Sequence, residues 1–176
     1  LQQAGITAAT KLTGGEVIVQ KGQPTGVLID NAIDLVAATI PDANATQARE
    51  ALLKAQENCF AAGLTTVDDC GLNYQQVQQI EEAYQSGALK MRLYVMLSDA
   101  PGNYKAIFER GKIKTDRLNV RSFKVYADGA LGSRGACLLQ PYADQAHHYG
   151  FLLSNPEHFD SVAALIYSKD FQMCTH

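Results

Sequence analysis

The 176-residue sequence lacks any continuous apolar run of the ~18 residues that a membrane-spanning helix needs. It also lacks the basic segment followed by an apolar segment that marks a secretory signal. Lys and Arg together number 15 and Asp and Glu 18, mixed along the chain, so there is no basic stripe to neutralise phosphates. We therefore expect a cytoplasmic protein that binds neither membrane nor nucleic acid.

Two kinds of covalent chemistry also lack their usual signatures. The four cysteines, Cys59, Cys70, Cys137 and Cys174, lie far apart without a CxxC spacing and in or beside apolar segments. We expect them to be free thiols in a reducing compartment. No GxSxG motif is present and no cysteine has a histidine close in sequence, so nucleophilic catalysis has little support.

What is present is a 47% apolar composition, enough for a core of ordinary size, and two stretches of different pattern. Residues 1–41 contain strand-like runs at 16–20 and 25–29 around a Gly/Pro turn, which predicts a β-hairpin, and a short helix over 31–40 that stops at Pro41. We expect this segment to precede a larger domain over residues 42–176.

Helices and strands alternate through that larger domain. The predicted helices cover residues 44–63, 73–87, 103–110 and 156–166, and the predicted strands cover 64–67, 91–97, 120–127 and 171–176. Such alternation indicates an α/β fold with a parallel sheet. A doubly wound open sheet and part of a (β/α)8 barrel both fit the pattern, and a chain that stops on an uncovered strand favours the partial barrel.

Charged residues gather where the predicted strands end, which is where α/β proteins place their sites. Lys124 lies within the apolar run 120–127, Asp128 follows that run, Asp68 and Asp69 follow an earlier strand, and His176 ends the last one. Together they predict a metal or acid/base site. The structural alternatives are a salt bridge for Lys124, a turn cap for Asp128 and a frayed terminus for His176.

Residues 129–135, here called the glycine loop, contain Gly129, Gly132 and Gly135. The loop matches neither GxGxxG nor GxxxxGK[ST], so tight backbone passage near a ligand is favoured over a phosphate-binding loop. The alternative to an enzyme is nevertheless a non-catalytic α/β domain that binds an anionic small molecule at this loop.

Four segments resemble the amidohydrolase superfamily, in its YtcJ-like branch that includes N-substituted formamide deformylase. They are FKVYADGALGSRGACLLQPYAD at 123–144, GLTTV at 63–67, GGEVIVQKGQPTGVLIDNA at 14–32 and CTH at 174–176. The resemblance implies a metal-dependent hydrolase on a TIM-type barrel that cleaves the C–N bond of a small amide-type substrate.

The resemblance also implies roles for individual residues. Lys124 would be carboxylated and bridge two divalent metals, zinc being expected, and His176 would be a second protein ligand. Asp128 and Arg134 would orient groups, and Asp68, Asp69 and Gly129 would lie on the substrate side.

The sequence departs from the family in several places. The first-strand HxH, a later histidine and the eighth-strand aspartate are absent, and Asp68 stands where the family often has histidine. We therefore expect an internal fragment covering about strands two to five of the barrel, inactive alone, with metal absent or weakly held and Lys124 a plain amine. Its open sheet edges and apolar interior face predict a homo-oligomer.

Overall fold

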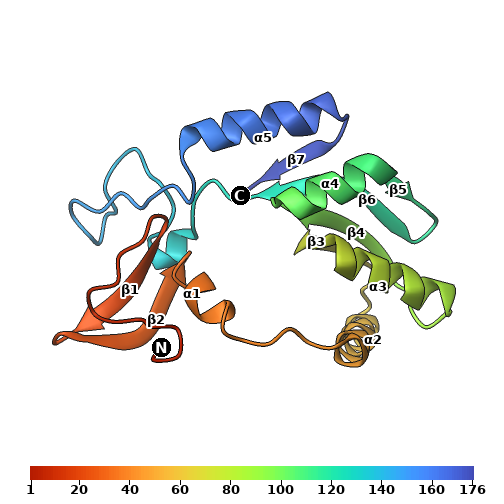
Figure 1. Ribbon diagram of the computed structural model, residues 1–176, viewed down its shortest axis with the longest axis horizontal. Coiled ribbons are helices and arrows are strands. Elements are labelled where there is room, and N and C mark those ends of the chain that lie inside the picture. Colours follow the sequence, from red (N-terminus) through yellow and green to blue (C-terminus); the bar gives the residue numbers. More distant parts are fainter. The chain divides into compact units, whose positions relative to one another are not determined.

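The computed structural model describes residues 1–176 and divides the chain into two compact units (Figure 1). The hairpin unit comprises Leu1–Asp42, Tyr126–Val162 and His176, and the sheet unit comprises Ala43–Val125 and Ala163–Thr175. The first break lies close to the predicted domain boundary after residue 41, but the hairpin unit also takes up later stretches of the chain. The division into domains 1–41 and 42–176 stays a prediction.

The hairpin unit contains the predicted β-hairpin, with longer strands than expected. Strands β1 (Gly15–Gln20) and β2 (Gln23–Asp30) pair antiparallel with Gln20 opposite Gln23. The two loop residues are therefore Lys21 and Gly22, whose φ angles of 51° and 76° are those of a type I′ turn. This turn matches the twist of the strands, and the pairing can therefore begin directly beside it.

Helix α1 (Asp34–Ala37) is much shorter than the predicted helix over residues 31–40. The residues on either side form four-residue turns instead, as in the bond from the Thr39 N–H to the Val36 carbonyl. The buried residues of this part of the unit are Ile6, Val17 and Ala32. A small apolar cluster therefore joins the chain start, the hairpin and the segment after it.

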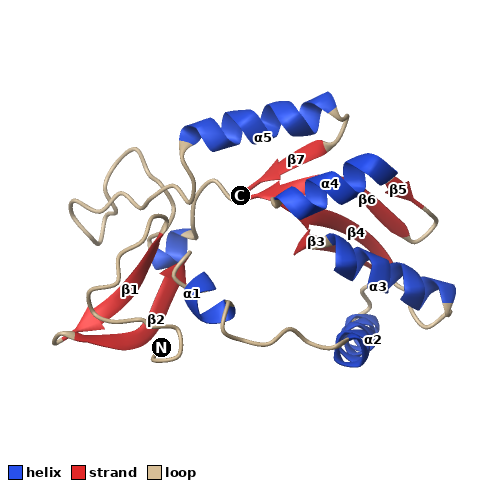
Figure 2. Cartoon of the chain, in the orientation of Figure 1, coloured by secondary structure: helices blue, strands red, loops and turns tan.

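The sheet unit alternates helices and strands (Figure 2). Its elements are α2 (Ala45–Ala61), β3 (Thr66–Leu72), α3 (Tyr74–Gln85), β4 (Arg92–Ser98), α4 (Pro101–Arg110), β5 (Ile113–Lys114), β6 (Leu118–Val125), the second half of α5 (Pro156–Ser168) and β7 (Gln172–Thr175). Helices α2 and α3 begin with the two predicted capping boxes, Asn44 with Gln47 and Asn73 with Gln76.

The sheet is parallel except for one short strand. β3, β4, β6 and β7 are parallel neighbours in that order, which is also their order along the chain, so no reversal of strand order falls among them. β5, which was not predicted, pairs antiparallel with Asn119 and Val120 of β6. The α/β class with a parallel sheet is confirmed, and the partial barrel stays a prediction.

A β-bulge at Arg121 sets which way the side chains of β6 point. Val120 lies opposite Val95 of β4, but the next pair is Ser122 with Met96, so Arg121 is an extra residue. After the bulge Phe123 and Val125 are buried like Leu118 and Val120 before it. Ser122 and Lys124 consequently point to the opposite face of the sheet.

The buried face of β6 packs against aromatic side chains of α4. Phe123 is fully buried, and its ring lies 4.5 Å from that of Tyr104 and 5.6 Å from those of Phe108 and Phe171. These contacts fix β6 between α4 and the start of β7. No helix of the chain has both the length and the apolar character that crossing a membrane requires.

Candidate functional site

Lys124 lies next to the carboxyl end of β6, on the sheet face away from the aromatic cluster. In register its neighbours are Ser98 of β4 and Cys174 of β7, so polar groups flank it on both sides. The lysine is half-buried. Its place at the end of a parallel strand is the one that a functional side chain takes in α/β proteins.

The same face carries a second polar group that is more deeply buried. Ser122 is completely inaccessible, and its Oγ has no hydrogen-bond partner. Farther along the face, the Tyr94 hydroxyl donates to Gln172 Oε1 at 3.4 Å. This face of the sheet, here called the polar face, therefore carries several polar groups beside Met96, whereas the helices cover the apolar face.

Asp68 and Asp69 lie within β3 and not after it, because the strand continues to Leu72. The expected placement of this pair beyond a strand end is therefore wrong. Neighbouring residues of a strand point to opposite faces, so the two carboxylates do not share a site. Asp68 is exposed and opposite Tyr94, whereas Asp69 accepts a hydrogen bond from the Gly71 N–H at 3.2 Å.

His176 belongs to the hairpin unit, whereas Lys124 belongs to the sheet unit. The His176 carbonyl accepts the Ala127 N–H at 3.3 Å, and its ring lies 5.5 Å from the Tyr126 ring. The terminus is thus held by the backbone and an aromatic neighbour, which argues against the frayed-terminus alternative.

The glycine loop is closed by its own backbone. The Gly129 N–H donates to the Gly135 carbonyl at 3.2 Å, and the Gly135 N–H donates to the Ala130 carbonyl at 3.0 Å. Asp128 adds a side-chain bond, since its Oδ2 accepts the Cys137 N–H at 2.8 Å. Asp128 therefore holds the ends of the loop together, which is the capping role weighed for it from sequence.

Asp30, at the end of β2, lies against this loop and was not found from the sequence. A Cβ on Gly129 would lie 2.6 Å from Asp30 Cγ, and one on Gly135 would collide with Oδ2. Oδ2 is hidden from solvent and has no hydrogen-bond partner. Burial raises the pKa of this carboxyl, an effect that His176 opposes and Asp128 reinforces. No local pattern signals such a contact between residues distant in sequence.

Arg134, a candidate orienting residue, is paired with another loop residue. Its Nη2 lies 2.7 Å from Asp144 Oδ2, and this bond lowers the pKa of the Asp144 carboxyl. The Arg134 carbonyl lies 2.8 Å from His148 Nε2. The guanidinium and the carbonyl of Arg134 both bond to the segment that follows the glycine loop, so Arg134 has a structural role here.

A divalent metal needs more ligands than the chain brings together. No group of three or more His, Cys, Asp or Glu side chains is placed to hold an ion. Lys124 and His176 supply two donors at most, and a protein zinc site takes three or four protein ligands. The residues present do not fit a complete metal site, and no catalytic step through a metal follows from them.

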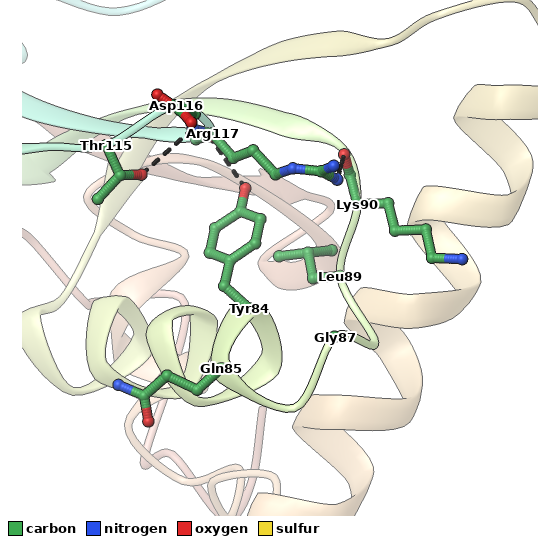
Figure 3. A pocket seen from close by; sticks show the side chains of 8 residues that line it. All are labelled: Tyr84, Gln85, Gly87, Leu89, Lys90, Thr115, Asp116 and Arg117. Carbon is green, nitrogen blue, oxygen red and sulfur yellow. Dashed lines mark hydrogen bonds between the residues drawn. The ribbon is translucent and has the colours of Figure 1, made fainter.

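One pocket of the sheet unit, of about 570 Å³, lies away from the predicted site (Figure 3). Tyr84, Lys90 and Arg117 line it, near the residues where β4 and β6 begin. The Tyr84 hydroxyl donates to the Met91 carbonyl at 2.6 Å, and the Arg117 guanidinium donates to the Lys90 carbonyl at 2.6 Å. These bonds join backbone segments, which is a structural role.

Comparison with known proteins assigns the chain to a class. All of residues 1–176 match the amidohydrolase family, so the chain belongs to that family. It is 29% identical to the putative amidohydrolase YtcJ of Bacillus subtilis (strain 168) and 26% identical to the protein LONG AFTER FAR-RED 3 of Arabidopsis thaliana. Each match covers the whole chain but only 34% and 33% of the relative, so the chain spans about a third of these proteins.

Two solved structures share the fold. Uncharacterized metal-dependent hydrolases from Pyrococcus horikoshii OT3 and Pyrococcus furiosus superpose with TM-scores of 0.74 and 0.70, each at 20% identity. The matches cover 91% and 99% of this chain and 34% and 36% of those proteins. The match of the whole chain to the amidohydrolase family confirms the resemblance that the sequence indicates, and the two structures show the same fold.

Proposed function

We propose that the whole protein is a metal-dependent hydrolase that cleaves the C–N bond of a small amide-type substrate. The observation that carries this proposal is Lys124 at the carboxyl end of a parallel strand, on the polar face, in a chain of the amidohydrolase family. The metal-dependent hydrolases that share the fold support the same chemistry.

Lys124, as its carbamate, and His176 are the proposed metal ligands, and the proposed metal is zinc. A carbamate offers hard oxygen ligands, and a bound divalent ion would supply an activated water. Both residues lie in or directly after neighbouring parallel strands, β6 and β7. The remaining ligands would have to come from residues outside this set.

The chain's own residues have more limited tasks in this proposal. Asp128 closes the glycine loop through the Cys137 N–H, and Arg134 is held by Asp144. Both act on the shape of the loop. Asp68 faces the same side of the sheet as Lys124 and remains a substrate-side candidate together with Gly129, whereas Asp69 points to the other side.

The alternative of an anion-binding glycine loop is disfavoured by Asp30. A carboxyl group lies against both Gly129 and Gly135, where an anion would have to approach the loop backbone. The loop N–H groups of these two glycines are also already used by carbonyls within the loop. We therefore do not propose this second function.

The experiment is a comparison of Lys124→Ala with Lys105→Ala in the whole protein. Lys105 is an exposed lysine of α4, so its loss is the matched control. We expect Lys124→Ala to lose its bound metal, measured by elemental analysis. We also expect it to lose the hydrolysis of N-formyl and N-acyl amines, whereas Lys105→Ala keeps both the metal and the activity. Intact-mass and crystallographic detection of the carbamate would complete the assignment. Full metal content in Lys124→Ala would contradict it.

Two structural proposals accompany this function. The unreversed order β3, β4, β6 and β7 supports a (β/α) barrel, because a doubly wound sheet reverses its strand order. β3 pairs with β4 alone and leaves an edge open, which supports a homo-oligomer of this chain. Sedimentation velocity would test the latter, and a monodisperse monomer would contradict it.

A further inference from the structure

The glycines at positions 129 and 135 are required by space and not by backbone conformation. Neither has the positive φ at which glycine is favoured. A methyl group at either position would instead run into the carboxyl group of Asp30. Gly132, in the same loop, has no atom within 4 Å of its Cβ position, so the constraint falls only on the two glycines that face Asp30.

Asp30 is itself held firmly in place. Its φ of 49° is left-handed, and its carbonyl accepts the Ile33 N–H at 2.8 Å. The next residue, Asn31, donates from Nδ2 to the Thr13 carbonyl at 3.0 Å and to the Leu153 carbonyl at 3.2 Å. The carboxyl group is therefore a fixed object, and the loop has to fit around it.

The carboxyl group stays there at an energetic cost. Oδ2 is buried without a hydrogen bond, and burying such an atom is unfavourable. A costly contact that fixes two points of a loop next to Asp128 fits a role in shaping that loop.

We propose that Asp30 is a positioning residue that keeps the glycine loop closed and thereby fixes Asp128, the residue that directly precedes the loop. The inference rests on the proposed function, because the loop follows the strand of Lys124 in the chain. Asp30 acts by shape: its carboxyl group occupies the space next to Gly129 and Gly135 and leaves the loop one backbone path. It touches neither substrate nor metal in this role.

The first test measures loop closure by amide hydrogen exchange at Gly129 and Gly135. Asp30→Gly removes the side chain and tolerates the left-handed φ, whereas Asp30→Asn keeps the shape. We expect exchange about tenfold faster in Asp30→Gly and changed less than about twofold in Asp30→Asn. Unchanged exchange in Asp30→Gly would overturn the proposal.

The second test is a double-mutant cycle with Gly132→Ala as the matched control. Gly129→Ala should open the loop when Asp30 is present and add nothing in the Asp30→Gly background, because the colliding atoms are gone. Gly132→Ala should have no effect in either background. An equally harmful Gly129→Ala in both backgrounds would overturn the proposal.

The third test links the loop to activity in the whole protein. We expect Asp30→Gly to lower kcat about tenfold with little change in KM, and Asp30→Asn to restore it. If Asp30→Gly keeps its kcat while Lys124→Ala is inactive, the positioning role is overturned and the proposed function stands. A different outcome is also informative. If Asp30→Gly speeds amide hydrogen exchange at Gly129 and Gly135 but the whole protein hydrolyses no amide, the proposed function is overturned and the loop contact is established.

Discussion

Replacing Phe123 by alanine tests whether the aromatic cluster fixes the strand that carries Lys124. Phe123 is fully buried and contacts rings from two directions, Tyr104 and Phe108 of α4 and Phe171 before β7. Because these neighbours belong to separate elements, the cavity cannot close by the movement of one of them. We expect a loss of about 3–5 kcal/mol in the free energy of unfolding.

The assay is urea unfolding followed by far-UV circular dichroism, since the chain has no tryptophan to report by fluorescence. For a chain of this size a loss of ~4 kcal/mol lowers Tm by roughly 8–16 °C. Phe123→Leu keeps most of the volume and should cost about 1–2 kcal/mol. Tyr167→Ala, at a side chain 86% exposed, is the control and should change stability by less than ~0.5 kcal/mol.

The refuting result is a loss below about 1 kcal/mol in Phe123→Ala with an unaltered urea dependence. It would mean that the cluster collapses freely around the missing ring and that β6 is held by its backbone pairing alone. In that case the position of Lys124 would depend on strands β4 and β7 and not on helix α4.

Three further predictions concern single local features. Arg121 has no partner residue in β4, so deleting it should leave every other β6 side chain on its own face of the sheet and cost less than ~1 kcal/mol in the free energy of unfolding. Deleting Asn119 should cost more, and the reverse order of the two losses in urea unfolding would refute the bulge. Burial raises the pKa of Tyr84 from 10.0 to about 12, so the stability that this difference contributes is fully present below pH 10 and is lost as the pH rises to about 12. In Tyr84→Phe, the free energy of unfolding should lose this part of its dependence on pH. Identical pH dependences in the two proteins would refute the prediction. Asn73→Ala should cost about 0.5–2 kcal/mol in urea unfolding because α3 loses its capping bond to Gln76, and Asn73→Asp should not; equal losses would refute this.

Features with a local physical cause were predictable from the sequence. Asn44 and Asn73 each precede a glutamine at the spacing of a capping box, and both helices begin there. The Gly/Pro-rich turn predicted the hairpin, although the observed turn is shorter and consists of Lys21 and Gly22 alone. Such features depend on neighbours a few positions away, so the residues that determine them lie together in the sequence.

Features set by distant partners were not predictable. β5 has only two residues and exists because Val120 and Asn119 offer it an edge. The Arg121 bulge is defined by the pairing of β6 with β4. Asp30 contacts the glycine loop only in the folded chain, because the two lie far apart in sequence. For the candidate site, sequence placed Lys124 correctly in its strand but set Asp68 and Asp69 beyond a strand that in fact contains them.

The make-up of the hairpin unit has a consequence for how the chain is synthesised. Its first part, Leu1–Asp42, leaves the ribosome long before Tyr126–Val162, and the bond from Asn31 to the Leu153 carbonyl cannot form until that later part is made. At ordinary elongation rates the delay is roughly ten seconds. During that time the first part of the unit lacks its later partners, so we expect the unit to complete its fold only after Tyr126–Val162 has been synthesised.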